Sequence, residues 1–213
     1  MRGFTPVTYI NTPAAIARYL IKLRHTVLHT KGGPNTSGAA IPHWDSNGII
    51  PPVDLKNPLV KRSPWRVSLE DVVLTFGTSP ERRKLLSGFL SFRSELHKIG
   101  LAQGFQWIDG SFLENIELLE TRDPHDIDVV TFFHLPDSCT EKSLAETFPH
   151  VFDHDNVKDT YYVDSYIINL DDMPLEFIIS NSAYWYSVWS HRRDMRWKGY
   201  FQIDLSQIND PLA

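Results

Sequence analysis

Two short apolar segments, residues 104–109 and 127–133, constrain this chain more than any other feature of its sequence. The first runs directly into Gly110-Ser111, and the second begins inside the motif Asp126-Ile127-Asp128. Short runs of β-branched and aromatic residues bounded by turn residues are typical of buried strands. We therefore predict two core strands, one ending in a glycine-serine turn and the other beginning at a pair of acids.

The acid pair predicts a cation site. Side chains alternate along a strand, so Asp126 and Asp128 point to one face, about 6–7 Å apart, while Ile127 and Val129 point into the core. Two carboxylates on one face repel each other unless a cation lies between them, and Mg²⁺ or Mn²⁺ suits such hard oxygen ligands. The alternative is a solvated sheet edge that carries two acids and no metal.

The Gly110-Ser111 turn indicates an anion site. Glycine lets a phosphate approach the backbone closely, and the N-terminus of a following helix offers unpaired N–H groups and a favourable dipole. Ser111 with Glu114 also fits a helix capping box. We expect the Ser111 hydroxyl to serve both purposes.

A third acid is expected on a neighbouring strand, where it would complete the metal site and accept the proton of an attacking hydroxyl. Asp164 lies in the apolar run 161–168, where an acid is costly unless it has a partner. Glu176, in the next apolar run, is the alternative. Order along the chain favours Asp164.

The remaining pattern predicts an α+β or mixed α/β domain. Predicted helices cover residues 13–29, a short segment from Ser68, 79–99, 111–119, 143–147 and 183–190, and residues 31–64 form a long loop. Further strands are predicted over 160–170, 174–180 and 199–205, with Asp171-Asp172-Met173 as the turn of a hairpin. The stretch from His150 to Asp155 is interpreted as a polar loop rather than a metal site.

Composition narrows the class of protein. The chain has 213 residues, 42% of them hydrophobic, and one cysteine. This size allows one large domain with an extension, and a single cysteine excludes a disulfide framework and a cysteine-based zinc site. No apolar run reaches the ~20 residues that span a bilayer. We expect a cytoplasmic protein without a membrane segment.

The N-terminal region differs in charge from the rest. The net charge is −5, yet residues 1–44 contain no Asp or Glu and carry Arg2, Arg18, Lys22, Arg24 and Lys31. We predict a basic N-terminal helix and linker over 1–44, followed by a domain over 45–213. The basic arm either contacts nucleic acid or docks onto the acidic body.

Together the motifs resemble the nucleotidyltransferase superfamily of DNA polymerase β, which carries Gly-Ser, then Asp-x-Asp, then one later strand acid. More closely, the chain is similar to a bacterial family of nucleotidyltransferase-like proteins over roughly residues 45–205. The matching segments are Asn47-Gly48-Ile49-Ile50-Pro51-Pro52, Asp109-Gly110-Ser111-Phe112, Pro124 to Asp128, Trp185-Tyr186, Arg192-Arg193 and Lys198-Gly199.

The resemblance implies a nucleotidyltransferase (polymerase β-like) fold, with a central mixed sheet flanked by helices and an N-terminal helical extension. It assigns Gly110 and Ser111 to a triphosphate, Asp126 and Asp128 to both metals, and Asp164 to the catalytic metal. Arg192 and Lys198 are further candidates for the triphosphate, because cationic side chains match phosphate oxygens. The segment between Ser111 and Asp126 is longer than is usual in that superfamily.

The expected function is metal-dependent transfer of a nucleoside monophosphate from an NTP or dNTP to an acceptor hydroxyl, with release of pyrophosphate. The acceptor is a nucleic-acid end, a protein or a small molecule, and a second copy or a cognate protein is the expected partner. Similar stand-alone proteins occur in toxin–antitoxin and anti-phage defence systems. The alternatives are a catalytically silent nucleotide-binding antitoxin or regulator, and a nucleic-acid-binding protein that acts through its basic arm.

Overall fold

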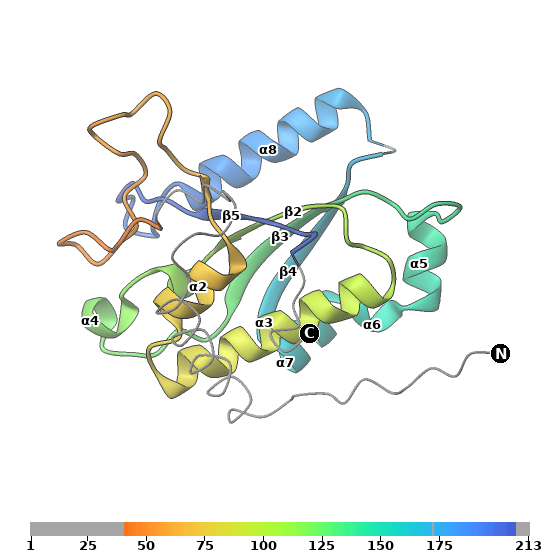
Figure 1. Ribbon diagram of the computed structural model, residues 1–213, viewed down its shortest axis with the longest axis horizontal. Helices are drawn as coiled ribbons and strands as arrows, with labels where there is room; N and C mark the ends of the chain where they lie inside the picture. Colours follow the sequence, from red (N-terminus) through yellow and green to blue (C-terminus); the bar gives the residue numbers. More distant parts are fainter. Residues whose placement is uncertain (1–40, 172, 208–213) are drawn as a thin grey trace, which may run out of the picture.

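The computed structural model describes residues 41–171 and 173–207. They form a mixed α/β domain in which a five-stranded mixed sheet is flanked by helices (Figure 1). The helix expected over 13–29 and most of the basic arm lie outside the described residues. Within the described part of the chain, no helix is both long and apolar enough to cross a membrane.

The sheet runs in the order β1-β5-β2-β3-β4. Its strands are β1 (Trp65–Arg66), β2 (Gly104–Asp109), β3 (Ile127–Phe133), β4 (Val163–Asn169) and β5 (Phe201–Asp204). The outer pairs β1–β5 and β3–β4 are parallel, and β2 is antiparallel to both of its neighbours. The predicted strands over 104–109 and 127–133 are confirmed, and they are adjacent in the sheet.

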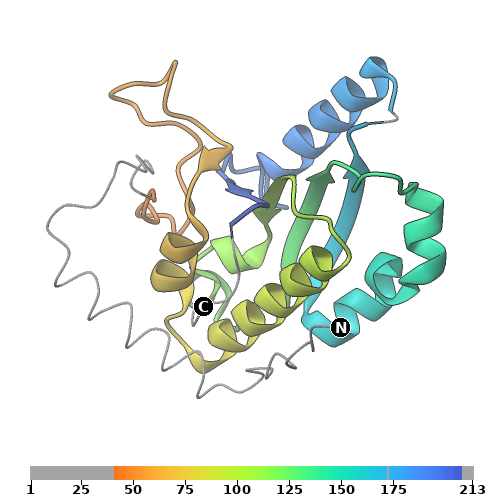
Figure 2. The same ribbon diagram turned by 45° about the vertical axis from the view of Figure 1, so that its right-hand side comes forward.

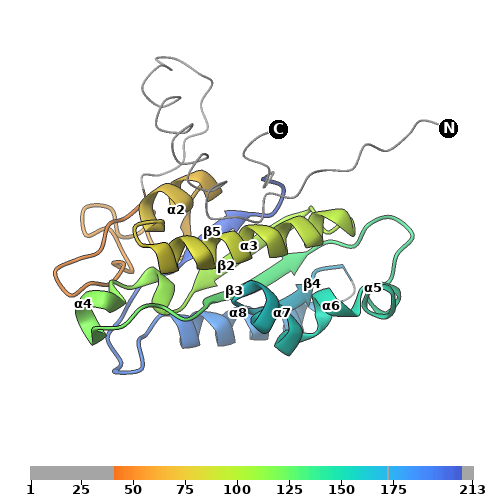
Figure 3. The same cartoon turned by 90° about the horizontal axis from the view of Figure 1, so that it is seen from below.

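Helices cover both faces of this sheet. They are α2 (Leu69–Phe76), α3 (Pro80–Lys98), α4 (Ile116–Glu120), α5 (Glu141–Thr147), α6 (Pro149–Phe152), α7 (His154–Tyr161) and α8 (Leu175–Trp189), with a 3₁₀ turn η1 at Ser111–Leu113. Figures 2 and 3 show α3 and α7 on one face and α8 on the other. The site described below therefore lies on a sheet that is packed from both sides.

Helix α3 supplies much of the core. Ser79 caps it by accepting a hydrogen bond from the Arg82 backbone N–H, and Pro80 occupies its first turn, as the sequence predicts. Its buried apolar side chains are Leu85, Leu86, Phe89, Phe92 and Leu96. Burying each such side chain contributes about 1.5–3 kcal/mol, so this helix contributes substantially to the packing of the sheet.

The predicted strand over 174–180 and its hairpin are wrong, because Leu175–Trp189 is one helix. The apolar, β-branched run favours a strand, but the side chains that face the protein are Ile178, Ser182, Trp185 and Trp189. Their spacing of four, three and four residues is helical. Tertiary packing selects the helix: Trp185 lies against Tyr166 of β4, with tilted rings whose centroids are 4.6 Å apart.

The polar loop predicted around 150–155 is also wrong, because α6 and α7 occupy it. Asp153 caps α7 by accepting a hydrogen bond from the Asn156 backbone N–H. Pro149 begins α6, and Val151 and Val157 bury one face of the two helices. A proline, a capping acid and two apolar anchors were the available signals of helix.

Candidate functional site

One open pocket collects every predicted site residue. Its volume is about 510 Å³. The predicted residues that line it are Gly110, Ser111, Asp126, Asp128, Asp164, Arg192 and Lys198. Glu176, the alternative third acid, lies in the first turn of α8 and is not part of the lining. Of the two candidates, only Asp164 therefore meets the acid pair.

Sheet pairing brings the acids together. In the β3–β4 ladder Asp128 is opposite Asp164, and in the β2–β3 ladder it is opposite Asp109. Ile127 and Val129 are fully buried, so the expected alternation of β3 is confirmed. Three neighbouring strands thus place an acid at nearly the same level of the sheet.

Asp128 is the most perturbed of the pocket acids. Burial raises its pKa to about 6, and the nearby carboxylates of Asp126 and Asp164 add to the shift. Its side chain forms no ion pair with any residue in 41–171 or 173–207. A buried carboxylate without an ion-pair partner is stabilised by a cation, so the pocket beside Asp128 is a favourable place for one.

Gly110 allows Asp128 to occupy this position. The glycine has φ +87°, and a Cβ built on it would lie 1.9 Å from Asp128 Oδ2. Any side chain at residue 110 would therefore displace the carboxylate as well as strain the backbone. The glycine brings the turn and the acid pair into contact.

Asp164 is held by two side chains of α7. Lys158 Nζ lies 2.6 Å from Asp164 Oδ2 and 3.0 Å from Asp126 Oδ2. His154 Nε2 lies 2.8 Å from the other oxygen, Asp164 Oδ1. Although burial raises the pKa of Asp164, the hydrogen bonds from Lys158 and His154 lower it overall. The same bonds raise the pKa of Lys158 and of His154.

Lys158 and His154 were not predicted as site residues. They are four residues apart on α7, which places them on one face of the helix, and the helix leads directly into the strand that carries Asp164. Their spacing is visible in the sequence, but the interpretation of His150 to Asp155 as a polar loop hides the helix that joins them. Both side chains reach Asp164 only because α7 packs next to β4.

The acids suit a divalent cation by their chemistry, since carboxylate oxygens are the ligands that Mg²⁺ and Mn²⁺ prefer. The Lys158 ammonium shows that a cation is bound between two of them. As the side chains stand, no three His, Cys, Asp or Glu residues within 41–171 and 173–207 form a metal-binding group. The donor set fits a metal held by two carboxylates, with waters or phosphates as further ligands.

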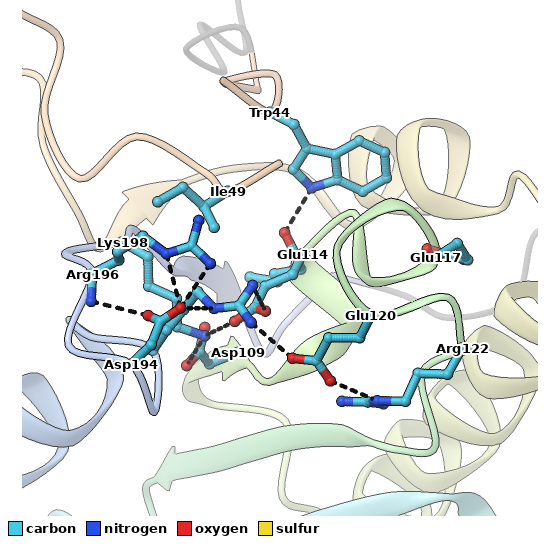
Figure 4. A network of polar contacts seen from close by, with 12 residues as sticks. Trp44, Ile49, Asp109, Glu114, Glu117, Glu120, Arg122, Asp194, Arg196 and Lys198 are labelled. Atoms are coloured by element: carbon cyan, nitrogen blue, oxygen red, sulfur yellow. Dashed lines mark hydrogen bonds and ion pairs between the residues drawn. The ribbon is translucent and has the colours of Figure 1, made fainter. Parts of the chain in front are cut away.

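A second ionic network connects the residues on either side of the Gly110-Ser111 turn, and Figure 4 labels Asp109, Glu114 and Lys198 among its members. Lys198 Nζ is 2.9 Å from Asp109 Oδ2 and 3.0 Å from Glu114 Oε1, so it joins the residues on either side of the turn. Arg192 Nη1 is 2.9 Å from Glu114 Oε2, and Arg192 Nη2 is 2.8 Å from Glu120 Oε1. Lys198 is only 4% exposed, so its ammonium is committed to these acids.

Burial and ion pairing have opposite effects on the pKa values of this second network. It raises the pKa of Asp109 to about 7 against the attraction of Lys198. Burial also lowers the pKa of Lys198, but Asp109 and Glu114 outweigh it and the net shift is upward. The pair is therefore mutually dependent, because each charge is tolerated inside the protein only with its partner.

The expected capping box of Ser111 and Glu114 is wrong. The turn η1 has no side-chain cap, and Glu114 is extended at φ −102° and ψ 154°. Its carboxylate instead contacts Lys198 and Arg192. The single helix predicted over 111–119 is accordingly broken into η1 and α4, because Glu114 points into the ionic network and not back to the turn.

The segment Asp45 to Pro52 supports the pocket from outside. The Asn115 backbone N–H donates to the Gly48 carbonyl at 2.8 Å, and the Gly199 N–H donates to the Ile50 carbonyl at 2.7 Å. One loop thus holds both the chain that follows Ser111 and the chain that carries Lys198. This contact gives a structural reason for the Asn-Gly and Pro-Pro motif noted in the sequence.

Comparison with known proteins identifies one family. The model of a family described as "Family of unknown function (DUF6932)" matches residues 42–204. That range contains every pocket residue named above. Neither the curated proteins nor the solved structures gave a significant match.

Proposed function

Since the chain belongs to the family DUF6932, whose description states no activity, we propose its function from the pocket: metal-dependent nucleotidyl transfer. A nucleoside monophosphate passes from a nucleoside triphosphate to an acceptor hydroxyl, and pyrophosphate is released. We also propose that the sheet is of the polymerase β-like type. The Gly-Ser turn ends β2, the acid pair begins β3 and one acid lies on β4, which is the order that the resemblance requires.

One observation carries this proposal. A glycine-serine turn, three strand acids and cationic side chains line the same open cavity of about 510 Å³. Phosphoryl transfer needs little covalent chemistry from a protein, and depends mainly on positioning and on charge stabilisation. Acidic and cationic side chains in one cavity supply both needs.

The turn and the arginines would bind the triphosphate. Ser111 opens the 3₁₀ turn at the pocket. Arg193 lines the cavity and forms no ion pair with any described residue, so its guanidinium is available to phosphate oxygens. Arg192 lies beside it but is shared with Glu114 and Glu120. We assign phosphate contact mainly to Arg193. Lys198 would act indirectly, by holding Asp109 and Glu114 on either side of the turn.

In the reaction, the acceptor oxygen attacks the α-phosphorus, and the bond from that phosphorus to the bridging oxygen breaks. Pyrophosphate carries away the electron pair. Bound Mg²⁺ or Mn²⁺ would be held by Asp126 and Asp128 and would supply positive charge to the phosphate oxygens. A pocket carboxylate takes the hydroxyl proton.

The experiment incubates the protein with each labelled triphosphate, Mg²⁺ or Mn²⁺, and nucleic-acid, protein or small-molecule acceptors. Wild type is compared with Asp126→Asn/Asp128→Asn and with Glu176→Gln, a matched control whose acid lies outside the pocket. We expect label transfer by wild type and by the control, and none by the double variant.

Absence of transfer under every condition would favour a silent nucleotide-binding module. Transfer that survives Asp126→Asn/Asp128→Asn would exclude the proposed site. Loss of transfer in Glu176→Gln would show that Glu176 takes part in the reaction after all. Binding to nucleic acid that disappears with residues 1–32, and that ignores the acid pair, would favour the basic arm as the functional element.

A further inference from the structure

We propose that Lys158 is a resident cation of the acidic cluster and that it limits the site to a single divalent metal ion, held at Asp126 and Asp128. This inference rests on the proposed function. It goes beyond it, because the resemblance assigns the acids to two metals and includes no lysine. The evidence is the geometry of one ammonium group and two carboxylates.

Lys158 lies where a second cation would have to bind. Its Nζ is within 3.0 Å of Asp126 Oδ2 and within 2.6 Å of Asp164 Oδ2. A metal that joined Asp126 to Asp164 would need the same space. The ammonium therefore takes the place of an ion that bridges the first and third acids.

Both carboxylate oxygens of Asp164 already have a partner. Lys158 contacts one oxygen, and His154 Nε2 contacts the other at 2.8 Å. Both partners come from α7, which packs directly against β4. A metal at Asp164 would have to displace at least one of these two side chains.

Asp128 is in the opposite situation. Its carboxylate lies against Gly110 and forms no ion pair with any side chain in the described parts of the chain. Asp126 offers Oδ1, because Lys158 contacts its Oδ2. Mg²⁺ and Mn²⁺ bind readily through one or two carboxylates when waters or phosphates complete the shell.

The charges of the cluster point to the same stoichiometry. Asp126, Asp128 and Asp164 provide three carboxylates, and Lys158 provides one ammonium at contact distance. With a neutral His154 the remainder is two negative charges, which one divalent ion neutralises, and a protonated His154 leaves only one. A second divalent ion would make the cluster positive before any phosphate enters.

The test counts bound Mn²⁺ on the full-length protein without nucleotide, by electron paramagnetic resonance and by calorimetry. The variants are Lys158→Met, which keeps the aliphatic stem, and Lys158→Arg, which keeps the charge. We expect one Mn²⁺ for wild type and for Lys158→Arg, and two for Lys158→Met. Removing the ammonium should also tighten binding of the first ion by at least about tenfold, since like charges a few ångströms apart repel even in water.

Two Mn²⁺ ions on wild type, or one on Lys158→Met, would overturn the inference. A thermal melt of each variant shows that it is folded, and the wild-type count decides the question even if Lys158→Met does not fold. Transfer activity is measured separately. Two ions on an active wild type leave the proposed function standing, whereas one ion on a wild type that transfers no nucleotide removes the function and keeps Lys158 as a cation of the site.

Discussion

Two lysines at this pocket make the same contact in different surroundings. Lys198 joins Asp109 to Glu114 at 2.9 and 3.0 Å, and Lys158 joins Asp126 to Asp164 at 3.0 and 2.6 Å. The Lys198 side chain is 5% exposed, however, and that of Lys158 is 41% exposed. One bridge is therefore part of the interior, and the other is open to whatever enters the cavity.

The difference in exposure gives two similar ion pairs different effects on stability and on ligand binding. A buried charge that loses its partner is left without solvation, so the pair is needed for folding. A half-exposed charge is solvated in any case, so the pair adds little stability, while its field still acts on ligands. We assign Lys198 to the support of the Gly110-Ser111 turn, and we propose that Lys158 occupies one cation position of the acidic cluster.

The largest expected effect comes from the buried bridge. Lys198→Met leaves Asp109 and Glu114 without their shared cation, and breaking such a pair from one side costs about 3–5 kcal/mol. Urea unfolding measures the loss. The double variant Lys198→Met/Asp109→Asn should recover part of it, and a loss below about 1 kcal/mol in Lys198→Met would remove the distinction between the two lysines.

Gly110→Ala should affect both the buried network of Lys198 and the acidic cluster of Lys158, because residue 110 follows Asp109 and contacts Asp128. The new Cβ would meet Asp128 Oδ2 at 1.9 Å, at a backbone φ of +87°. We expect a loss of about 1–3 kcal/mol from backbone strain together with weaker Mn²⁺ binding from the displaced carboxylate. Unfolding and Mn²⁺ titration of one preparation test both, and unchanged Mn²⁺ affinity would show that the glycine does not position Asp128.

Asp128→Asn should stabilise the protein at neutral pH while it abolishes metal binding. The pKa of Asp128 rises from 3.8 to about 6 on folding, so folding favours the protonated form. The ionised form therefore destabilises the fold increasingly as pH rises through this interval, and the penalty is absent below it. We expect the free energy of unfolding of Asp128→Asn to exceed that of wild type by roughly 1–3 kcal/mol near neutral pH. The difference should disappear in acid, where Asp128 is protonated in both states.

Unfolding curves of wild type and Asp128→Asn across that range of pH measure the gain directly. A constant difference at all pH values would show that the asparagine acts through packing. A variant less stable than wild type at neutral pH would contradict the raised pKa of Asp128.

The smallest expected effect on stability belongs to the exposed bridge. Lys158→Met should cost less than about 1 kcal/mol, because ion pairs of this exposure contribute little. Urea unfolding beside Lys198→Met makes the comparison direct, since both substitutions remove an ammonium and keep an aliphatic chain. A cost similar to that of Lys198→Met would mean that Lys158 is also structural.

Local patterns in the sequence predicted the strands β2 and β3, the helix α3 and the acids at the pocket. These features depend on neighbouring residues. Alternation along β3 sends Asp126 and Asp128 to one face wherever the strand lies, and Ser79-Pro80 starts a helix in most surroundings. The error at 174–180 arose where local propensity favoured a strand and tertiary packing selected a helix.

The amino-acid sequence alone identified the turn and the acids that line the pocket, because a Gly-Ser turn and an Asp-x-Asp pair are short motifs with local geometry. Only the tertiary structure decided which cations meet these acids. Lys158 reaches Asp126 from 32 positions along the chain, and Lys198 reaches Asp109 from 89. Such pairings follow from strand order and helix placement, which depend on the packing of the whole domain, and burial then separates the structural lysine from the one open to ligands.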